Sequence, residues 1–143
     1  MIEVGTILGP TGWRTVTQDD IDAFAALSGD RQWIHTDVER ATRESPYGTT
    51  IAHGNLTLAL IDGFRDELVS VTTGARMGVN MGYDRVRFPA PVPSGGEVRA
   101  SLEVVSVAER GEWLEVIQRF TVELRGGNRP VCVADSVIRV LPA

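Results

Sequence analysis

The segment from Leu56 to Phe64 constrains the fold most, because it reads as a helix with apolar residues on nearly every side. A helix of this kind is normally buried all round, whereas a surface helix carries a single apolar stripe. Its most apolar run, Leu56 to Ile61, is too short to span a bilayer and contains Thr57. We therefore expect the remainder of the chain to wrap around this helix.

The part of the chain after Gly74 has the sequence pattern of β-strands, which can surround the apolar helix. Four strands are predicted, over residues 79–88, 97–107, 112–124 and 131–140. The third strand carries apolar residues mostly on one face, and the last is apolar on both faces. Residues 108–111 and 125–130 look like hairpin loops, so the strands are expected to form an antiparallel meander.

Shorter elements are predicted before the central helix. Residues 13–16 read as a short strand, and Thr17 opens a capping box for a helix that Gly29 can end. Asp37 can cap a second short helix over residues 38–43. The chain therefore alternates short helices and loops before the strands begin.

Length and element order together predict one α+β domain over residues 1–143. One strand comes first, a helical region with the apolar helix follows, and the antiparallel strands come last. An antiparallel β-sheet wrapped around the central apolar α-helix buries that helix best.

Charge and the N-terminal residues narrow the classes of partner. A formal net charge of −5 argues against a general nucleic-acid binder, because affinity for the phosphate backbone needs a cationic surface. A small anionic ligand needs only a few local arginines and is compatible with this charge. Residues 1–5 show neither a basic segment nor an apolar core, so no signal peptide is visible and a cytoplasmic protein without a membrane partner is expected.

The few cysteines and histidines indicate neither a disulfide nor a metal centre. Cys132 is the single cysteine, and its apolar neighbours predict a buried thiol on a strand. The two histidines, His35 and His53, do not make a zinc set with that cysteine when scattered in this way. No metal site is therefore expected.

Asp30 and His35 lie five residues apart, directly after the predicted helix end at Gly29. From these positions a carboxylate and an imidazole can reach the same small volume. Such a pair suits the movement of a proton onto or off a carbon next to a carbonyl. Taken alone, each residue has a plainer interpretation, Asp30 as a turn carboxylate and His35 as a structural imidazole.

Three ordered motifs resemble those of the MaoC-like hydratases and dehydratases, which include the (R)-specific enoyl-CoA hydratases and have the hotdog fold. The first is an aromatic residue, a short spacer, Ser-Gly-Asp-x-Asn-Pro-aliphatic-His and a downstream small residue. It is matched by Phe24, Ser28, Gly29, Asp30, Ile34, His35 and Ala41. The second, aliphatic-Ala-His-Gly, is matched by residues 51–54, and the third, Asn-Tyr-Gly-x-Asp-Arg-Val-Arg-Phe-Pro-Ala-Pro-Val, by residues 80–92. The resemblance covers nearly the whole chain.

The resemblance implies a hydro-lyase that reversibly adds water across the double bond of a trans-2-enoyl thioester, giving the (R)-3-hydroxyacyl thioester. Asp30 and His35 would hold and deprotonate the water, and the backbone N–H of Gly54 would bind the thioester oxygen. The substrate would be a coenzyme A or acyl-carrier-protein thioester, which is already activated, so no cofactor is implied. The family also implies a homodimer whose sheets join edge to edge.

The chain departs from the first motif between the acid and the base, where Gln32-Trp33 stands in place of Asn-Pro. Proline would stiffen this loop, whereas the larger Trp33 can narrow or line the acyl pocket. Met81 stands where the family commonly has tyrosine, and no consequence is assigned to it. Acyl chain length and the choice between coenzyme A and carrier protein stay open.

Five further residues each have a functional and a structural interpretation. His53 can belong to the substrate site or form a hydrogen bond at the helix start. Gly54 can offer its N–H to an oxyanion or allow close helix–sheet packing. Tyr47 can line the acyl tunnel or pack on the surface. Arg85 and Arg87 share one face of a strand, where they can contact substrate phosphates or pair with neighbouring acids.

Two other functions use the same fold. A hotdog thioesterase typically directs a carboxylate from the central helix at the thioester carbon. This helix offers Asn55 and Thr57 but no acid before Asp62, which counts against that function. A non-catalytic acyl-thioester binder is the second alternative, and it would have no use for a matched acid–base pair.

Overall fold

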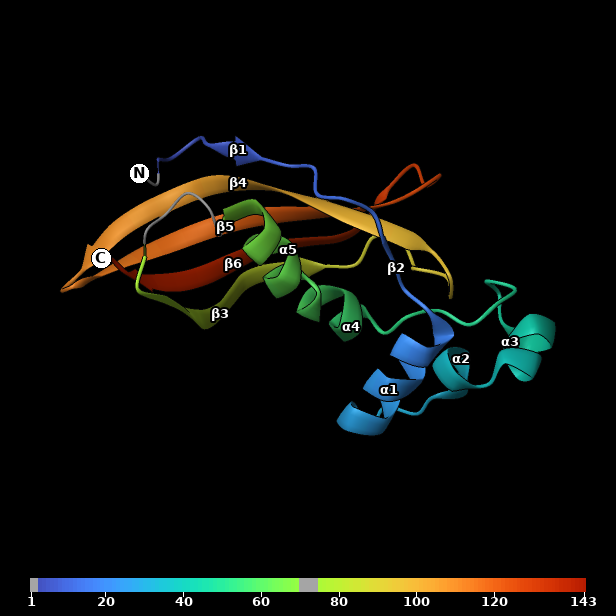
Figure 1. The fold of residues 1–143 in the computed structure, drawn as a ribbon. Helices are drawn as coiled ribbons and strands as arrows, with labels where there is room; N and C mark the ends of the chain where they lie inside the picture. The colour runs from blue at the N-terminus through green and yellow to red at the C-terminus, as the bar shows by residue number, and fades with distance from the viewer. Residues whose placement is uncertain (1–2, 70–74) are drawn as a thin grey trace.

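The computed structural model describes residues 3–69 and 75–143 and shows an antiparallel sheet curled around a helical segment (Figure 1). The strands are β1 (Ile7–Leu8), β2 (Arg14–Thr15), β3 (Met77–Arg87), β4 (Glu97–Arg110), β5 (Trp113–Leu124) and β6 (Pro130–Leu141). The helices are α1 (Gln18–Ser28), α2 (Trp33–Thr36), α3 (Val38–Glu44), α4 (Gly54–Ala59) and α5 (Ile61–Val69). Gly74, where the sequence changes to strands, lies outside the described residues, as do Met1 and Ile2. The α+β prediction is confirmed.

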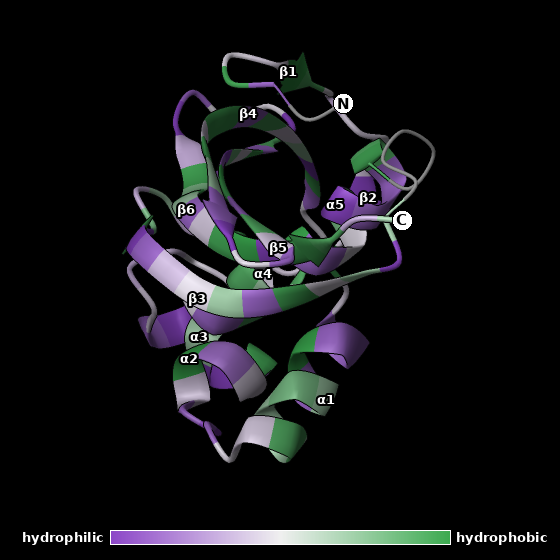
Figure 2. Ribbon diagram, turned by 90° about the vertical axis from the view of Figure 1, so that its left-hand side faces the viewer, coloured by the Kyte–Doolittle hydropathy of each residue, from purple (hydrophilic) through white to green (hydrophobic). Residues whose placement is uncertain are grey.

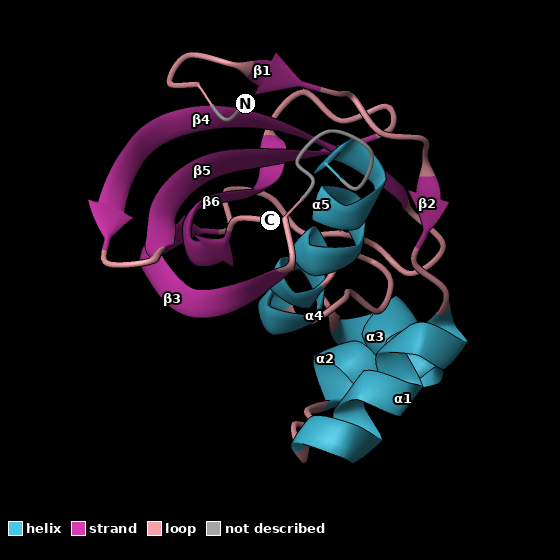
Figure 3. Cartoon of the chain, turned by 60° about the vertical axis from the view of Figure 1, so that its left-hand side comes forward, coloured by secondary structure: helices cyan, strands magenta, loops and turns pink. Residues whose placement is uncertain are grey.

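The sheet has the strand order β1–β4–β5–β6–β3, with β2 also paired to β4. Strands β4, β5 and β6 form the predicted meander, although β4 runs to Arg110 and shortens the predicted hairpin loop. The meander prediction is wrong for β3, which pairs with β6 rather than with β4, the next strand in sequence. Pro89, Pro91 and Pro93 follow β3 and lack the N–H groups that a paired hairpin strand needs. The chain therefore crosses to the opposite edge of the sheet (Figure 3).

Helices α4 and α5 form the predicted apolar segment, interrupted at Leu60, and lie against the inner side of the curved sheet (Figure 3). Leu56, Ile61 and Phe64 are buried in the core. The expectation of burial on every side is wrong for the single chain, because Ala59 is exposed and Leu60 is half-buried. The sheet curls past one side of the segment and leaves the other side open. No helix in the described ranges is long and apolar enough to cross a membrane.

Helix α1 begins and ends where the sequence predicts. The Thr17 hydroxyl accepts a hydrogen bond from the Asp20 N–H at 3.1 Å, and the Asp20 carboxylate accepts one from the Thr17 N–H at 3.0 Å. Gly29 ends the helix at φ +82°, and its N–H donates to the Ala25 carbonyl at 2.9 Å. Asp30 therefore follows a well-defined helix end. Figure 2 shows α1, α2 and α3 gathered together at one end of the curved sheet.

A buried polar network fastens α5 to the sheet. The Arg65 guanidinium donates from Nε to the Gln118 side-chain oxygen at 2.8 Å and from Nη2 to the Ser136 hydroxyl. It also pairs with Asp62 and lies 5.1 Å from the centre of the Phe120 ring. Gln118 is only 2% exposed, so its polar group sits within the apolar inner face of β5. Arg65 supplies the hydrogen bond that makes this burial tolerable.

We expect Gln118→Leu to destabilise the protein. The substitution leaves the Arg65 Nε donor without its acceptor in a largely buried place, which costs about 1–3 kcal/mol. The melting temperature should fall by about 3 °C or more. Thr121→Leu is the control, because Thr121 lies exposed on the same strand and its substitution should leave the melting temperature nearly unchanged. An unaltered melting temperature for Gln118→Leu would show that the network adds nothing to stability.

Candidate active site

Asp30 precedes the short helix α2, His35 lies within it, and their side chains are close together. A carboxylate oxygen of Asp30 and one imidazole nitrogen from each of His35 and His53 lie within 4.8 Å of one another. Asp30 is exposed, whereas both histidines are buried. Two groups at this separation can hydrogen-bond a single water, since each such bond spans about 2.8 Å. The structure thus brings the predicted acid and base within reach of one small reactant.

The hydrogen bond of His35 determines which of its nitrogens can accept a proton. Nδ1 lies 2.7 Å from the carbonyl oxygen of Ile51. Because a carbonyl oxygen can only accept, Nδ1 carries the proton and Nε2 presents a lone pair. Gln18 holds the same turn in place, donating to the His35 carbonyl at 2.8 Å and accepting from the Thr50 hydroxyl at 2.6 Å. The imidazole is therefore oriented as a base.

His53 directly precedes α4 and connects it to the loop that carries the acid. Its Nε2 donates to the main-chain carbonyl of Asp30 at 2.8 Å, and its ring stacks on His35 with 3.9 Å between ring centres. The Phe24 ring packs against it as well, at 4.9 Å between centres. Its buried Nδ1 has no hydrogen-bond partner among the described residues. These contacts agree with the structural interpretation of His53, a hydrogen-bonded residue at the helix start.

The arrangement of the histidines also bears on metal binding. The two histidines are expected to be scattered, and that expectation is wrong, because they meet beside Asp30. Their rings are nearly parallel, at 24° to each other. An ion shared by two imidazoles lies close to both ring planes, about 2.0–2.1 Å from each nitrogen. Stacked rings do not allow this, so these described side chains do not fit a zinc set.

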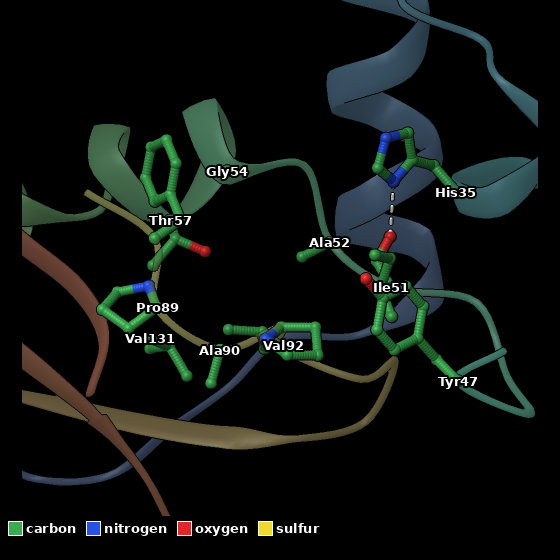
Figure 4. A pocket seen from close by; sticks show the side chains of 12 residues that line it. His35, Tyr47, Ile51, Ala52, Gly54, Thr57, Pro89, Ala90, Val92 and Val131 are labelled. Carbon is green, nitrogen blue, oxygen red and sulfur yellow. Dashed lines mark hydrogen bonds between the residues drawn. The ribbon is translucent and has the colours of Figure 1, made fainter. Parts of the chain in front are cut away.

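A cavity of about 250 Å³ lies next to His35 (Figure 4). In Figure 4, His35 and Tyr47 lie on one side of it, and Thr57, Pro89 and Val131 lie on the other. The remaining lining residues are mostly apolar: Ile51, Ala52, Gly54, Phe88, Ala90, Pro91 and Val92. Of the predicted site residues, those that do not line the cavity are Asp30, Trp33, His53, Arg85 and Arg87. The cavity suits an apolar chain whose reacting end lies near an imidazole.

Gly54 packs closely against Phe88 at the start of α4. A Cβ atom at position 54 would lie 2.8 Å from the Phe88 ring, so this close contact is possible only because glycine has no side chain. The backbone N–H of Gly54 has no hydrogen-bond partner among the described residues. Gly54 therefore allows close packing against Phe88, and its unpaired N–H is also a free hydrogen-bond donor beside the cavity.

Trp33 and Tyr47 stand in different relations to the cavity. Trp33 is the first residue of α2, and the Arg40 guanidinium covers its ring at 4.2 Å from the ring centre. Tyr47 is 53% exposed and lines both this cavity and a neighbouring one of about 310 Å³. Tyr47 therefore belongs to the wall shared by the two cavities, whereas Trp33 lies away from both.

Arg85 and Arg87 line a third cavity, of about 450 Å³, together with Arg119 and Asp135. The structure does not bear out the interpretation in which Arg85 and Arg87 pair with neighbouring acids, because neither arginine forms an ion pair within the described ranges. Asp135, the acid in this cavity, accepts two hydrogen bonds from Arg119 instead, at 2.8 and 3.2 Å. These bonds and the carboxylate charge raise the pKa of Arg119.

Cys132 takes no part in these cavities. It is fully buried, and burial raises the pKa of its thiol to about 11. The thiol is therefore protonated near neutral pH and out of reach of solvent, and the prediction of a buried strand thiol is confirmed.

Three cavity residues have weak sequence signals or none. Thr57 is a buried hydroxyl within an otherwise apolar helix, and that contrast is a signal for a polar lining residue. Phe88 and Val131 look like ordinary residues near the end of a strand. Only the path of the chain brings them to the cavity.

Comparison with known proteins now identifies the family. Residues 3–123 match the MaoC-like domain family. The 3-hydroxyacyl-thioester dehydratase Z of Mycobacterium tuberculosis (strain ATCC 25618 / H37Rv) is 43% identical over 136 residues, which cover 94% of this chain and 89% of the relative. Nodulation protein N of Rhizobium leguminosarum bv. viciae is 41% identical over 133 residues, covering 92% of this chain and 83% of the relative.

Solved structures agree with these matches. The unliganded R-hydratase PhaJ1 from Pseudomonas aeruginosa superposes with a TM-score of 0.77 at 25% identity, over 99% of this chain and 84% of that one. The predicted hotdog arrangement is confirmed by this similarity and by the sheet curled around α4 and α5. The chain therefore belongs to the MaoC-like family of dehydratases and hydratases.

Proposed function

We propose that the protein reversibly hydrates a trans-2-enoyl thioester to the (R)-3-hydroxyacyl thioester, with Asp30 and His35 as the acid–base pair. The observation that supports this most is the approach of the two side chains to within 4.8 Å of each other, with His35 on the wall of a cavity whose lining residues are mostly apolar. The relatives named as a 3-hydroxyacyl-thioester dehydratase and an R-hydratase support the same reaction class.

In the hydration direction, Asp30 and His35 hold one water against C3 of the substrate. The lone pair on His35 Nε2 takes a proton from the water as its oxygen bonds to C3. The electrons of the C2–C3 double bond then move toward the thioester oxygen, which becomes enolate-like. The same pair returns a proton to C2, which restores the carbonyl, and dehydration follows these steps in reverse. These reaction steps need the His35 tautomer that the hydrogen bond to Ile51 sets.

The thioester oxygen is placed against the N–H of Gly54. Negative charge develops on this oxygen in the transition state, and a donor already held in place stabilises it without reorganisation. The unpaired state of that N–H in the described structure supports this role. The acyl chain then occupies the cavity lined by Tyr47.

The alternative thioesterase function has less support. No residue that lines the cavity within the described part of the chain is a carboxylate. Asp62, the first acid along the helical segment, pairs with Arg65 and has a side chain that is 54% exposed. A carboxylate directed at the thioester carbon is therefore missing from this arrangement.

An assay with trans-2-butenoyl-CoA separates the three functions. Loss of the enoyl absorbance without release of free thiol supports the hydro-lyase, and chiral chromatography of the product should give the (R) enantiomer. Release of thiol would instead support the thioesterase. Saturable binding with neither change would support the non-catalytic binder. A series of chain lengths with the same assay measures how much of the acyl chain the cavity accepts.

A homodimer is proposed as the assembly. Strand β3 pairs only with β6 among the described strands, so its other edge presents unpaired N–H and C=O groups. Met77, Val79 and Met81 on this strand are large apolar residues that are exposed in the single chain. A second copy joining along β3 would cover both features. Light scattering at micromolar concentration should give the mass of two chains or a multiple of two, and a mass near one chain would contradict the proposal.

We expect His53→Phe to reduce kcat about tenfold, the scale of one lost hydrogen bond. The phenylalanine ring retains the stacking on His35 but cannot donate to the Asp30 carbonyl, so the acid loses one of the contacts that position it. KM should change less than kcat if His53 acts by positioning. Equal changes in both constants, or a loss of activity that follows a lower melting temperature, would point to a purely structural role.

A further inference from the structure

The cavity of Arg85, Arg87 and Arg119 lies on the outer face of the sheet. Ser136 faces α5, since its hydroxyl accepts a hydrogen bond from Arg65. Side chains alternate along a strand, so the neighbouring Asp135 points to the opposite face. Asp135 is paired in register with Arg85 of β3 on one side and Arg119 of β5 on the other. The cavity of about 450 Å³ is thus built from three adjacent strands.

The positive charge of this cavity is only partly compensated. Asp135 is occupied by the two hydrogen bonds from Arg119, and the two charges neutralise each other. Arg85 and Arg87 are left without an acidic partner among the described residues, and both are exposed. Two uncompensated guanidinium groups therefore share a concave surface on a protein whose net charge is −5. Such a place attracts an anion, and guanidinium groups are well matched to phosphate oxygens.

Pro89 connects this cavity to the candidate active site. It follows β3 by two residues and lines both the cavity that contains His35 and the one that contains the arginines. Figure 4 shows it on the wall opposite His35. A substrate arm that leaves the active site past Pro89 therefore meets Arg87 and Arg85 next.

We infer that Arg85 and Arg87 bind a phosphate group on the carrier arm of the thioester substrate, with the Arg119–Asp135 pair as the wall of this subsite. The inference rests on the proposed function for the identity of the arm. A phosphate on phosphopantetheine is common to coenzyme A and to acyl carrier protein, and coenzyme A has further phosphates on its nucleotide. The subsite would hold the arm at a point away from the reacting carbons, so it should affect substrate capture rather than the chemical step.

The test compares three trans-2-butenoyl thioesters, carried by pantetheine, by 4′-phosphopantetheine and by coenzyme A. The wild type should show a kcat/KM about 10–100-fold higher for the phosphorylated carriers, as charged hydrogen bonds to phosphate would provide. The Arg85→Ala/Arg87→Ala double variant should lose this preference, so that its kcat/KM for the phosphorylated carriers falls to the value for the pantetheine thioester. A melting temperature close to that of the wild type shows that the variant is folded.

Two single variants serve as controls. Arg110→Ala removes one positive charge at the end of β4, away from the residues that line these cavities, and should retain the preference. Arg129→Ala tests the competing route, because Arg129 lines the neighbouring cavity of about 310 Å³ that shares Tyr47 with the active site. Loss of the preference in Arg129→Ala, and not in the double variant, would overturn the inference.

The same three thioesters also show which phosphate the arginines bind. A preference for both phosphorylated carriers assigns the subsite to the phosphate of the pantetheine arm, and trans-2-butenoyl acyl carrier protein should then depend on the arginines too. A preference for coenzyme A alone assigns it to the nucleotide phosphates. No preference in the wild type refutes the subsite. If no thioester is hydrated, the proposed function fails, and calorimetric binding of 4′-phosphopantetheine against pantetheine then decides the subsite by itself.

Discussion

The Asp30→Asn and His35→Ala variants are each expected to hydrate an enoyl thioester about 10²–10⁴ times more slowly than the wild type, the range for lost general acid–base catalysis. The Asp30→Asn substitution retains the shape of the side chain but neither its charge nor its basicity. The His35 substitution removes the Nε2 lone pair that the hydrogen bond to Ile51 leaves available. Steady-state kinetics with trans-2-butenoyl-CoA provides the measurement.

The double variant shows whether the two residues act as one unit. Groups that act together are not additive, so it should be little slower than either single variant. Because His35 is buried, His35→Asn is a useful companion, with an amide that can still donate to the Ile51 carbonyl but has no Nε2. Melting temperatures should move little for Asp30→Asn and His35→Asn. Near-wild-type rates, or losses explained by unfolding alone, would refute the assignment of the pair.

The second large effect is expected at Gly54, where packing and catalysis must be separated. A side chain at this position meets the Phe88 ring at 2.8 Å, so Gly54→Ala alone would disturb the helix start for steric reasons. The informative comparison is between Gly54→Ala and Gly54→Pro, both made in a Phe88→Ala background that gives the new atoms room. Alanine retains the backbone N–H, and proline removes it.

Proline fits this position otherwise. It is the first residue of α4, where proline is tolerated, and His53 before it has φ −60° and ψ 139°, a conformation that proline accepts in its neighbour. We expect kcat for the proline variant to be about 10²–10³ lower than for the alanine variant, as for the loss of one oxyanion donor. Equal rates in the two variants would show that the Gly54 N–H does not bind the developing charge.

The inner cavity and the arginine cavity are proposed to recognise different parts of the thioester substrate. Gly54 and His35 meet the reacting end in the inner cavity, and the arginine cavity meets the arm beyond Pro89. Loss of an inner contact should therefore lower kcat, whereas loss of the outer one should raise KM. The homodimer proposed along β3 would bring a second copy next to the strand that carries Arg85 and Arg87.

Features set by short-range chemistry could be predicted from the sequence. The capping box at Thr17 and the left-handed Gly29 depend on residues within one turn, and so the helix end that presents Asp30 was predictable. The five-residue spacing of Asp30 and His35 limits their separation in the same way. Apolar alternation likewise helped to locate β5, because it reports which face of a strand is buried.

Partners that are distant along the chain were decided only by the tertiary structure. Alternation indicates a buried face but not the neighbouring strand, so the pairing of β3 with β6 could not be inferred from it. The Ile51 carbonyl that sets the His35 tautomer lies 16 residues away, and the Asp30 carbonyl held by His53 lies 23 residues away. Asp135, the acid opposite Arg85, is bonded to Arg119 of β5 instead, a pairing that the sequence does not indicate. The sequence by itself determined which groups the protein has and their local turns, whereas the closure of the sheet around α4 and α5 decided which groups meet.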